Sequence, residues 1–105
     1  MTQLLRGNPH LAGVYCVGAG RTGIVAALEE FHPSRRPLVF MHDLTDRTHA
    51  WLADGLIDVI IDQNVQLVGE QAVIRLLGAI ATSAPQLQLT DIEPRIILRE
   101  NIPRR

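Results

Sequence analysis

A short apolar run, a glycine turn and an amphipathic stretch follow one another in residues 14–28. Residues 14–17 are apolar and β-forming, with turn residues on both sides, which is typical of a strand covered on both faces. Gly18 and Gly20 permit the sharp turn that follows. Apolar residues then recur at i, i+3, i+4 and i+7, from Ile24 to Phe31, which predicts a helix with one stripe on a sheet. A strand, a tight turn and a helix begin a βαβ unit, whose ligands bind at the carboxyl ends of its strands.

The rest of the chain alternates between predicted strands and helices. Further strands are expected at residues 38–41, 59–61 and 95–98, and further helices after the capping residues Thr45 and Asn64. The second of these helices is the longest, at residues 65–81, and residues 2–6 are typical of the end of another helix. The prolines in residues 32–37 and 82–90 indicate loops. This order favours an α/β fold, a three-layer sandwich with a mainly parallel sheet, in one domain of 105 residues.

Composition and residue spacing exclude several classes of function. The formal net charge is -1 and no lysine is present, so no basic patch for nucleic acid is expected. The four histidines are scattered without metal-ligand spacing, and no serine follows a nucleophile-elbow pattern, so we expect no metal site, no catalytic residue and no enzyme activity. The single cysteine, Cys16, lies inside the first predicted strand and is expected to be a small core residue. No apolar run approaches the roughly 20 residues of a membrane span, and we expect a cytoplasmic protein.

One candidate site is the pattern G-x-G-x-x-G at Gly18, Gly20 and Gly23, which follows a strand and opens a helix. A dinucleotide fold would place pyrophosphate at this helix N-terminus and a ribose-binding acid about 20 residues further on, where Asp43 lies. The pattern is short, and glycines at such a turn often serve only the turn. A small Rossmann-like dinucleotide-binding domain is therefore the alternative interpretation.

A second candidate site consists of Asp43 and Gln63, each of which follows an apolar strand. An acid and an amide at this edge of a sheet offer acceptors and donors for a polyhydroxylated small molecule. Considered from the residues alone, Asp43 could equally be a turn carboxylate before the Thr45 helix, and Gln63 an amide that closes a strand end. Both interpretations remain open at this point.

The order of the predicted elements resembles the sugar-sensing module of LacI-type transcriptional repressors, which share the fold of type I periplasmic binding proteins. The resemblance covers nearly the whole chain, and no single motif is decisive. Its segments are residues 11–15 (LAGVY), 18–20 (GAG), 40–45 (FMHDLT), 54–63 (DGLIDVIIDQ) and 94–103 (PRIILRENIP). The resemblance implies the C-terminal lobe of that fold, which senses a sugar-like effector without a cofactor and without catalysis.

The same resemblance implies roles for individual residues. In the family, the acid after the second of these strands and the glutamine after the third bind sugar hydroxyls, and they correspond here to Asp43 and Gln63. The first turn of the family often carries an Asn or Asp that touches the ligand. This chain has Gly20 followed by Arg21 there, so both are candidate ligand-binding residues and the effector is expected to differ from a simple pentose or hexose. Arg21 could meet an anionic group.

The resemblance also identifies what this chain lacks, namely a front lobe and a DNA-binding helix-turn-helix. Operator DNA would therefore be contacted only through a domain outside residues 1–105. The helix at 65–81 packs on the front lobe in the family, and leaving its Leu and Ile side chains uncovered would cost several kcal/mol at about 25 cal/mol per Å². We expect it to pack on its own sheet or, in preference, on a second copy in a homodimer. A stand-alone interaction module that dimerises through this helix is a third interpretation.

Overall fold

The structure is a computed structural model that describes residues 1–31, 36–81 and 91–104. It divides into two compact units, one formed by Met1–Asp62 with Ile96–Arg105 and the other by Gln63–Arg95. The predicted loop at 82–90, and residues 32–35 of the other predicted loop, lie outside the described residues.

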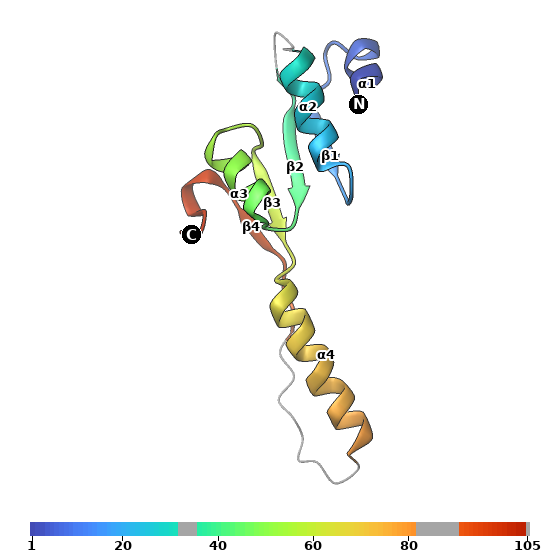
Figure 1. Ribbon diagram of the computed structural model, residues 1–105, viewed down its shortest axis with the longest axis vertical. Coiled ribbons are helices and arrows are strands. Elements are labelled where there is room, and N and C mark those ends of the chain that lie inside the picture. Colours follow the sequence, from blue (N-terminus) through green and yellow to red (C-terminus); the bar gives the residue numbers. More distant parts are fainter. Residues whose placement is uncertain (32–35, 82–90, 105) are drawn as a thin grey trace. The chain divides into compact units, whose positions relative to one another are not determined.

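A sheet with helices against it makes up the first unit (Figure 1). Its elements are α1 (Thr2–Gly7), β1 (Gly13–Cys16), α2 (Arg21–Phe31), β2 (Leu38–His42), α3 (Asp46–Ala53), β3 (Val59–Asp62), β4 (Arg95–Ile97, whose first residue belongs to the second unit) and the 3-10 helix η1 (Arg99–Asn101). The strand order is β1-β2-β3-β4, with β1, β2 and β3 parallel. The predicted α/β class with a mainly parallel sheet is confirmed, and the predicted strands and helices occur within two residues of their expected bounds.

One face of the sheet is packed into the core of this unit. Alternate strand residues point to this face, and Val39, Met41 and Ile60 on it are fully buried. Cys16 is also buried, as predicted for a core residue, and its thiol donates to the carbonyl of Gly18 at 3.4 Å. Helices α2 and α3 contribute Val25, Ala27, Leu28 and Leu52 to the same core.

The other face of the sheet is largely exposed, which differs from the expectation that the first strand is covered on both sides. Tyr15 on β1 is 56% exposed, and Leu38 on β2 and Ile96 on β4 are each 54% exposed. The short apolar run could not distinguish a half-covered strand from a fully covered one, because each of its residues is apolar whichever face it joins.

A bidentate ion pair joins β2 to β3 at the opposite edge from the candidate site. Arg36 donates from Nη1 and Nη2 to the two carboxylate oxygens of Asp58, each at 2.9 Å, and the amide of Val39 donates to Asp58 Oδ2 at 2.8 Å. Burial tends to raise the pKa of Asp58, but these hydrogen bonds and the charge of Arg36 outweigh it and hold the pKa below its usual value of 3.8.

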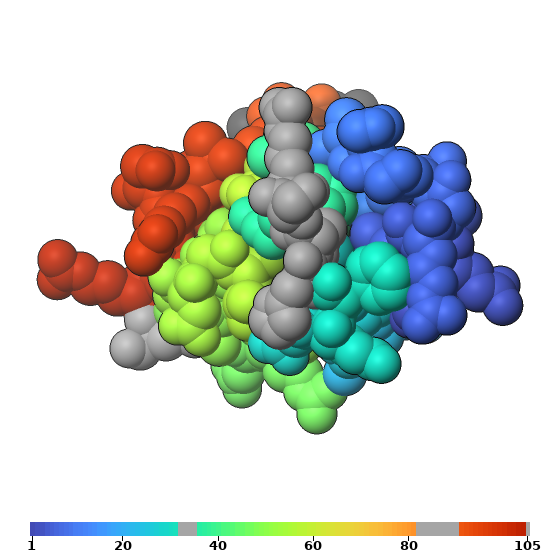
Figure 2. Space-filling view, turned by 90° about the horizontal axis from the view of Figure 1, so that it is seen from above, coloured from blue at the N-terminus to red at the C-terminus, as the bar shows by residue number. Residues whose placement is uncertain are grey.

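The C-terminal segment lies against α3 and β3. The ring of His49 on α3 is hydrogen-bonded through Nε2 to the carbonyl of Pro103 at 2.8 Å. Figure 2 shows the orange and red C-terminal surface beside the yellow-green surface of α3 and β3. The chain end is thereby fixed to the first unit.

The second unit contains the longest helix, α4 (Val65–Ile80), as predicted. Asn64 caps it by accepting from the amide of Leu67 at 3.4 Å, and Asn64 itself has a left-handed backbone with φ 50°. The apolar side chains of α4 are largely exposed: Val65, Val68, Val73, Leu76, Leu77 and Ile80. Among the described helices of the chain, none is long and apolar enough to cross a membrane.

Candidate functional site

The turn between β2 and α3 presents Asp43 at the carboxyl edge of the sheet. Asp43 has φ 69°, a left-handed conformation that Asp adopts more readily than most residues but that is still uncommon. Its amide donates to the carbonyl of Ile61 on β3 at 3.0 Å, and its own carbonyl accepts from the hydroxyl of Thr48 at 2.7 Å. The backbone of this predicted site residue is therefore held from two directions.

The first turn of α3 completes the support of this loop. Thr45 and Thr48 form a capping box, in which the amide of Thr45 donates to Thr48 Oγ1 at 2.8 Å and the amide of Thr48 donates to Thr45 Oγ1 at 3.2 Å. The amide of Leu44 donates to the buried carboxylate of Asp62 at 3.4 Å. Sequence reasoning identified Thr45 as the cap but missed Thr48 and Asp62. The T-x-x-T spacing was the signal for Thr48.

The glycine turn before α2 brings Arg21 to the same edge. Gly20 has φ 96°, so this position favours glycine, and its carbonyl accepts from the amide of Ile24 at 3.2 Å. From the first position of α2, Arg21 Nη1 donates to the carbonyl of His42 at 2.9 Å and to Asp43 Oδ2 at 3.5 Å. The two charged side chains are partly open to solvent, at 29% for Arg21 and 35% for Asp43. The structure therefore brings three predicted site residues, Gly20, Arg21 and Asp43, to one edge.

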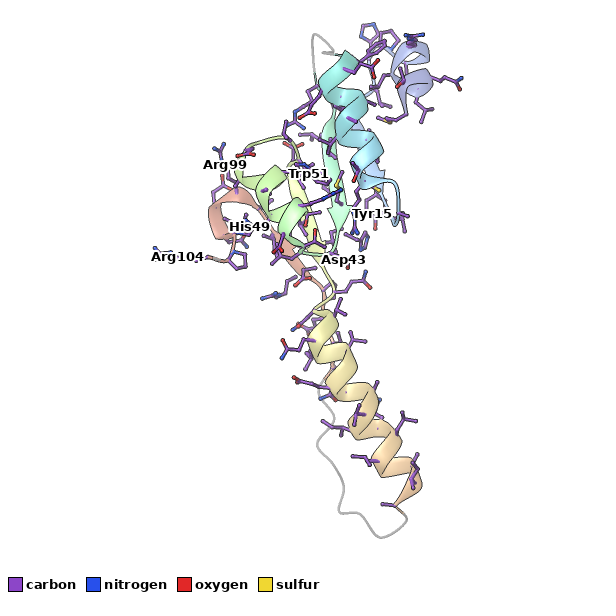
Figure 3. All side chains as sticks on the ribbon, viewed as in Figure 1. Tyr15, Asp43, His49, Trp51, Arg99 and Arg104 are labelled. Atoms are coloured by element: carbon purple, nitrogen blue, oxygen red, sulfur yellow. The ribbon has the colours of Figure 1, made fainter. Side chains whose placement is uncertain are left out.

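Two further contacts at this edge were not predicted. The hydroxyl of Tyr15 is hydrogen-bonded to Nε2 of His42, with the two ring centroids 5.4 Å apart (Figure 3 labels Tyr15 and Asp43 near the end of β2). Arg47 donates to Thr22 Oγ1 at 3.1 Å and so links the first turns of α3 and α2. Tyr15 and His42 are two residues out of step on neighbouring strands, which the sequence could reveal only once the strand register was known.

Gln63, the fourth predicted site residue, directly follows β3 and is the first residue of the second unit. It is exposed, and the structure describes it with α4 rather than with Asp43. Its place in the site stays a prediction.

The arrangement offers an acceptor carboxylate beside guanidinium and hydroxyl donors, which suits hydrogen bonding to a polar molecule. No group of three or more metal-binding side chains occurs among residues 1–31, 36–81 and 91–104. The G-x-G-x-x-G pattern fits a dinucleotide site less well in the structure, because the third glycine of such a site normally allows close packing of the helix on the strand. At Gly23 an added Cβ would meet no atom within 4 Å.

A parallel sheet with its supported acid at the carboxyl edge is the arrangement of α/β ligand-binding domains. The sequence profile of the periplasmic binding protein domain matches residues 1–82, and the chain belongs to this family. Among curated proteins, no significant match was found.

Solved structures share the fold at low sequence identity. A glucose-galactose binding protein, GanP of Geobacillus stearothermophilus, has a TM-score of 0.81 and 22% identity over 96% of this chain and 36% of its own. The XylFII-LytSN complex has a TM-score of 0.80 and 20% identity over 96% of this chain and 35% of its own. A carbohydrate transporter solute binding protein from Agrobacterium radiobacter, in complex with D-arabinose, has a TM-score of 0.77 and 23% identity over 95% of this chain and 34% of its own. The chain therefore spans about a third of the length of these proteins.

Proposed function

We propose that this chain is the effector-sensing part of a LacI-type transcriptional regulator and binds a small sugar-like molecule without chemical conversion. The observation that carries the proposal is the Asp43 carboxylate, which a clamped turn presents at the carboxyl edge of the sheet. The family match, and structural neighbours described as binding glucose and galactose or D-arabinose, support a sugar as the ligand class.

In this proposal each site residue has a defined role. Asp43 accepts hydrogen bonds from sugar hydroxyls, and Gln63 both donates and accepts through its amide. Gly20 leaves the turn open for close approach of the ligand, and Arg21 lies beside Asp43. A site that hydrogen-bonds a ligand hydroxyl binds an analogue without that hydroxyl more weakly, because the site's polar groups then lose their partner.

The proposed regulator acts in the cytoplasm through a change of conformational population. An effector that binds one state of the sensor better than the other shifts the equilibrium between them by its difference in affinity. Operator DNA is contacted through a DNA-binding domain outside this chain. The exposed apolar side chains of α4 support self-association as a homodimer.

The direct experiment compares Asp43→Ala and Gln63→Ala with wild type in the full-length product of the reading frame, measuring operator release by a panel of sugars. Loss of the effector response with operator binding intact is the expected result for both variants. Asp54→Ala is the matched control, because Asp54 is an exposed acid at the other end of α3. A normal effector response in both site variants would refute the assigned site.

A further inference from the structure

We infer that Arg21 is a positioning residue that fixes the Asp43 carboxylate, and that the site consequently takes a neutral polyhydroxylated ligand rather than an anionic one. The inference rests on the proposed function and deepens it by assigning the charge class of the ligand. It replaces the expectations that Arg21 itself meets an anion and that the effector differs from a simple pentose or hexose.

The contacts of Arg21 hold its guanidinium in place. A single nitrogen, Nη1, reaches the carbonyl of His42 at 2.9 Å and Asp43 Oδ2 at 3.5 Å. The first contact fixes the guanidinium on the backbone of β2, and the second sets it against the carboxylate of the next residue. Arg21 therefore connects the start of α2 to the last residue of β2 and to the first residue of the turn, and its side chain is oriented by the protein before any ligand arrives.

The backbone of Asp43 is held in an uncommon conformation. A left-handed residue other than glycine is uncommon and persists where its surroundings fix it. The Asp43 amide is held by Ile61, its carbonyl by Thr48 and the preceding carbonyl by Arg21. These contacts fix the backbone of Asp43, and the contact of Arg21 with Oδ2 restrains the carboxylate itself, which reduces the entropy lost when a hydroxyl binds to it.

Charges of both signs surround the turn. Asp43 and Asp46 lie at or next to this edge, as does Asp62, which accepts from the Leu44 amide, and the guanidinium groups of Arg21 and Arg47 contact Asp43 and Thr22 there. A ligand anion close to Arg21 would also lie close to Asp43, and like charges at such distances repel. A neutral ligand that offers hydroxyls meets no such repulsion and donates a charge-assisted hydrogen bond to the carboxylate.

The positioning role can be tested without a ligand by amide hydrogen exchange. Arg21→Met should speed exchange at the Asp43 amide by about tenfold, the effect expected for loss of one charge-assisted hydrogen bond. Arg21→Lys, which keeps the charge, should fall between Arg21→Met and wild type. Arg47→Met is the matched control, because Arg47 is a cation at the same edge that donates to Thr22 Oγ1 and not to Asp43. Unchanged exchange at Asp43 in Arg21→Met, in a variant that melts like wild type, would overturn the positioning role.

The ligand class is tested by calorimetry with two sets of probes, the neutral sugars D-glucose, D-galactose and D-arabinose and the acids D-glucuronate and D-galacturonate. Wild type should bind at least one neutral sugar and bind the acids at least tenfold more weakly. Arg21→Met and Asp43→Asn should each weaken neutral binding by about tenfold, and the double variant should be no weaker than either, because coupled residues are not additive.

The outcomes separate the two proposals. Selective loss of acid binding in Arg21→Met would show that Arg21 binds an anion and would overturn the inference. Absence of binding by every probe, together with altered exchange at Asp43, would count against the proposed sugar-binding function and against the neutral ligand class, while the positioning role of Arg21 would stand.

Discussion

The hydroxyl of Thr48 donates a hydrogen bond of 2.7 Å to the main-chain carbonyl of Asp43, from a side chain that is 0% exposed. The same oxygen accepts from the amide of Thr45 at 2.8 Å. One buried hydroxyl therefore ties the candidate ligand-binding acid to the first turn of α3. The position of Asp43 and the stability of the fold therefore depend on the same hydroxyl.

Replacement of Thr48 by Val should destabilise the protein by about 1–3 kcal/mol, because the partly buried Asp43 carbonyl and Thr45 amide lose their partner. Thr48→Ser keeps the hydroxyl and should cost only the buried methyl group, about 1 kcal/mol. Urea unfolding of the two variants measures the difference. A Val variant at least as stable as the Ser variant would contradict the role assigned to this hydroxyl.

The pair of Arg36 and Asp58 predicts a dependence of stability on pH. Because the folded pKa of Asp58 lies below its usual value of 3.8, the pair stabilises the fold above that pH, and the contribution is lost as the pH falls through the folded pKa. Asp58→Asn should lower the free energy of unfolding at neutral pH by about 1 kcal/mol, since the pair is partly exposed.

The measurement is chemical unfolding of wild type and Asp58→Asn from pH 7 down to below pH 3.8. The difference between the two proteins should be constant near neutrality and shrink at the acid end. A difference that stays the same at every pH would show that the Asp58 charge contributes nothing to stability.

Gly20 and Gly18 provide a paired test of the turn before α2. Gly20→Ala places a side chain at φ 96° and should cost about 1–2 kcal/mol in the free energy of unfolding. Gly18→Ala should be close to neutral, because an added Cβ there meets no atom within 4 Å. Thermal unfolding compares the two. Equal effects would mean that the left-handed conformation of Gly20 carries no cost.

The exposed apolar side chains of α4 predict concentration-dependent self-association. Leu77→Glu should weaken association at least tenfold, because it places a charge among exposed apolar side chains. Gln66→Lys adds a charge at an exposed polar position of the same helix and should leave association unchanged. Light scattering that shows a monomer for wild type from micromolar to millimolar concentration would refute this prediction.

Much of the fold could be predicted from the sequence, because its elements are locally encoded. A helix is specified within a few residues by the periodic stripe from Ile24 to Phe31, by the Thr45 cap and by the Asn64 cap, and the structure confirms all three helices. The apolar run of β1 predicted a strand but not which of its faces is exposed, since no alternation of apolar and polar residues exists where every residue is apolar.

The candidate site was predicted less completely than the fold. Asp43 and Arg21 were identified because they directly follow a strand or a glycine turn. The contacts of their neighbours were not, because Asp62 reaches Leu44 and Tyr15 reaches His42 only through strand register and the placement of α3. Hydrogen bonds between elements depend on tertiary geometry, and a single sequence shows only which residues could donate or accept them.

The measurement that tests the central claim most directly is calorimetric titration of neutral monosaccharides into the full-length product of the reading frame, wild type and Asp43→Asn side by side. We predict that wild type binds at least one of these sugars and that Asp43→Asn binds it at least tenfold more weakly, with Asp54→Asn unchanged. Equal affinity of wild type and Asp43→Asn would contradict the account, because the clamped carboxylate would then have no part in ligand binding.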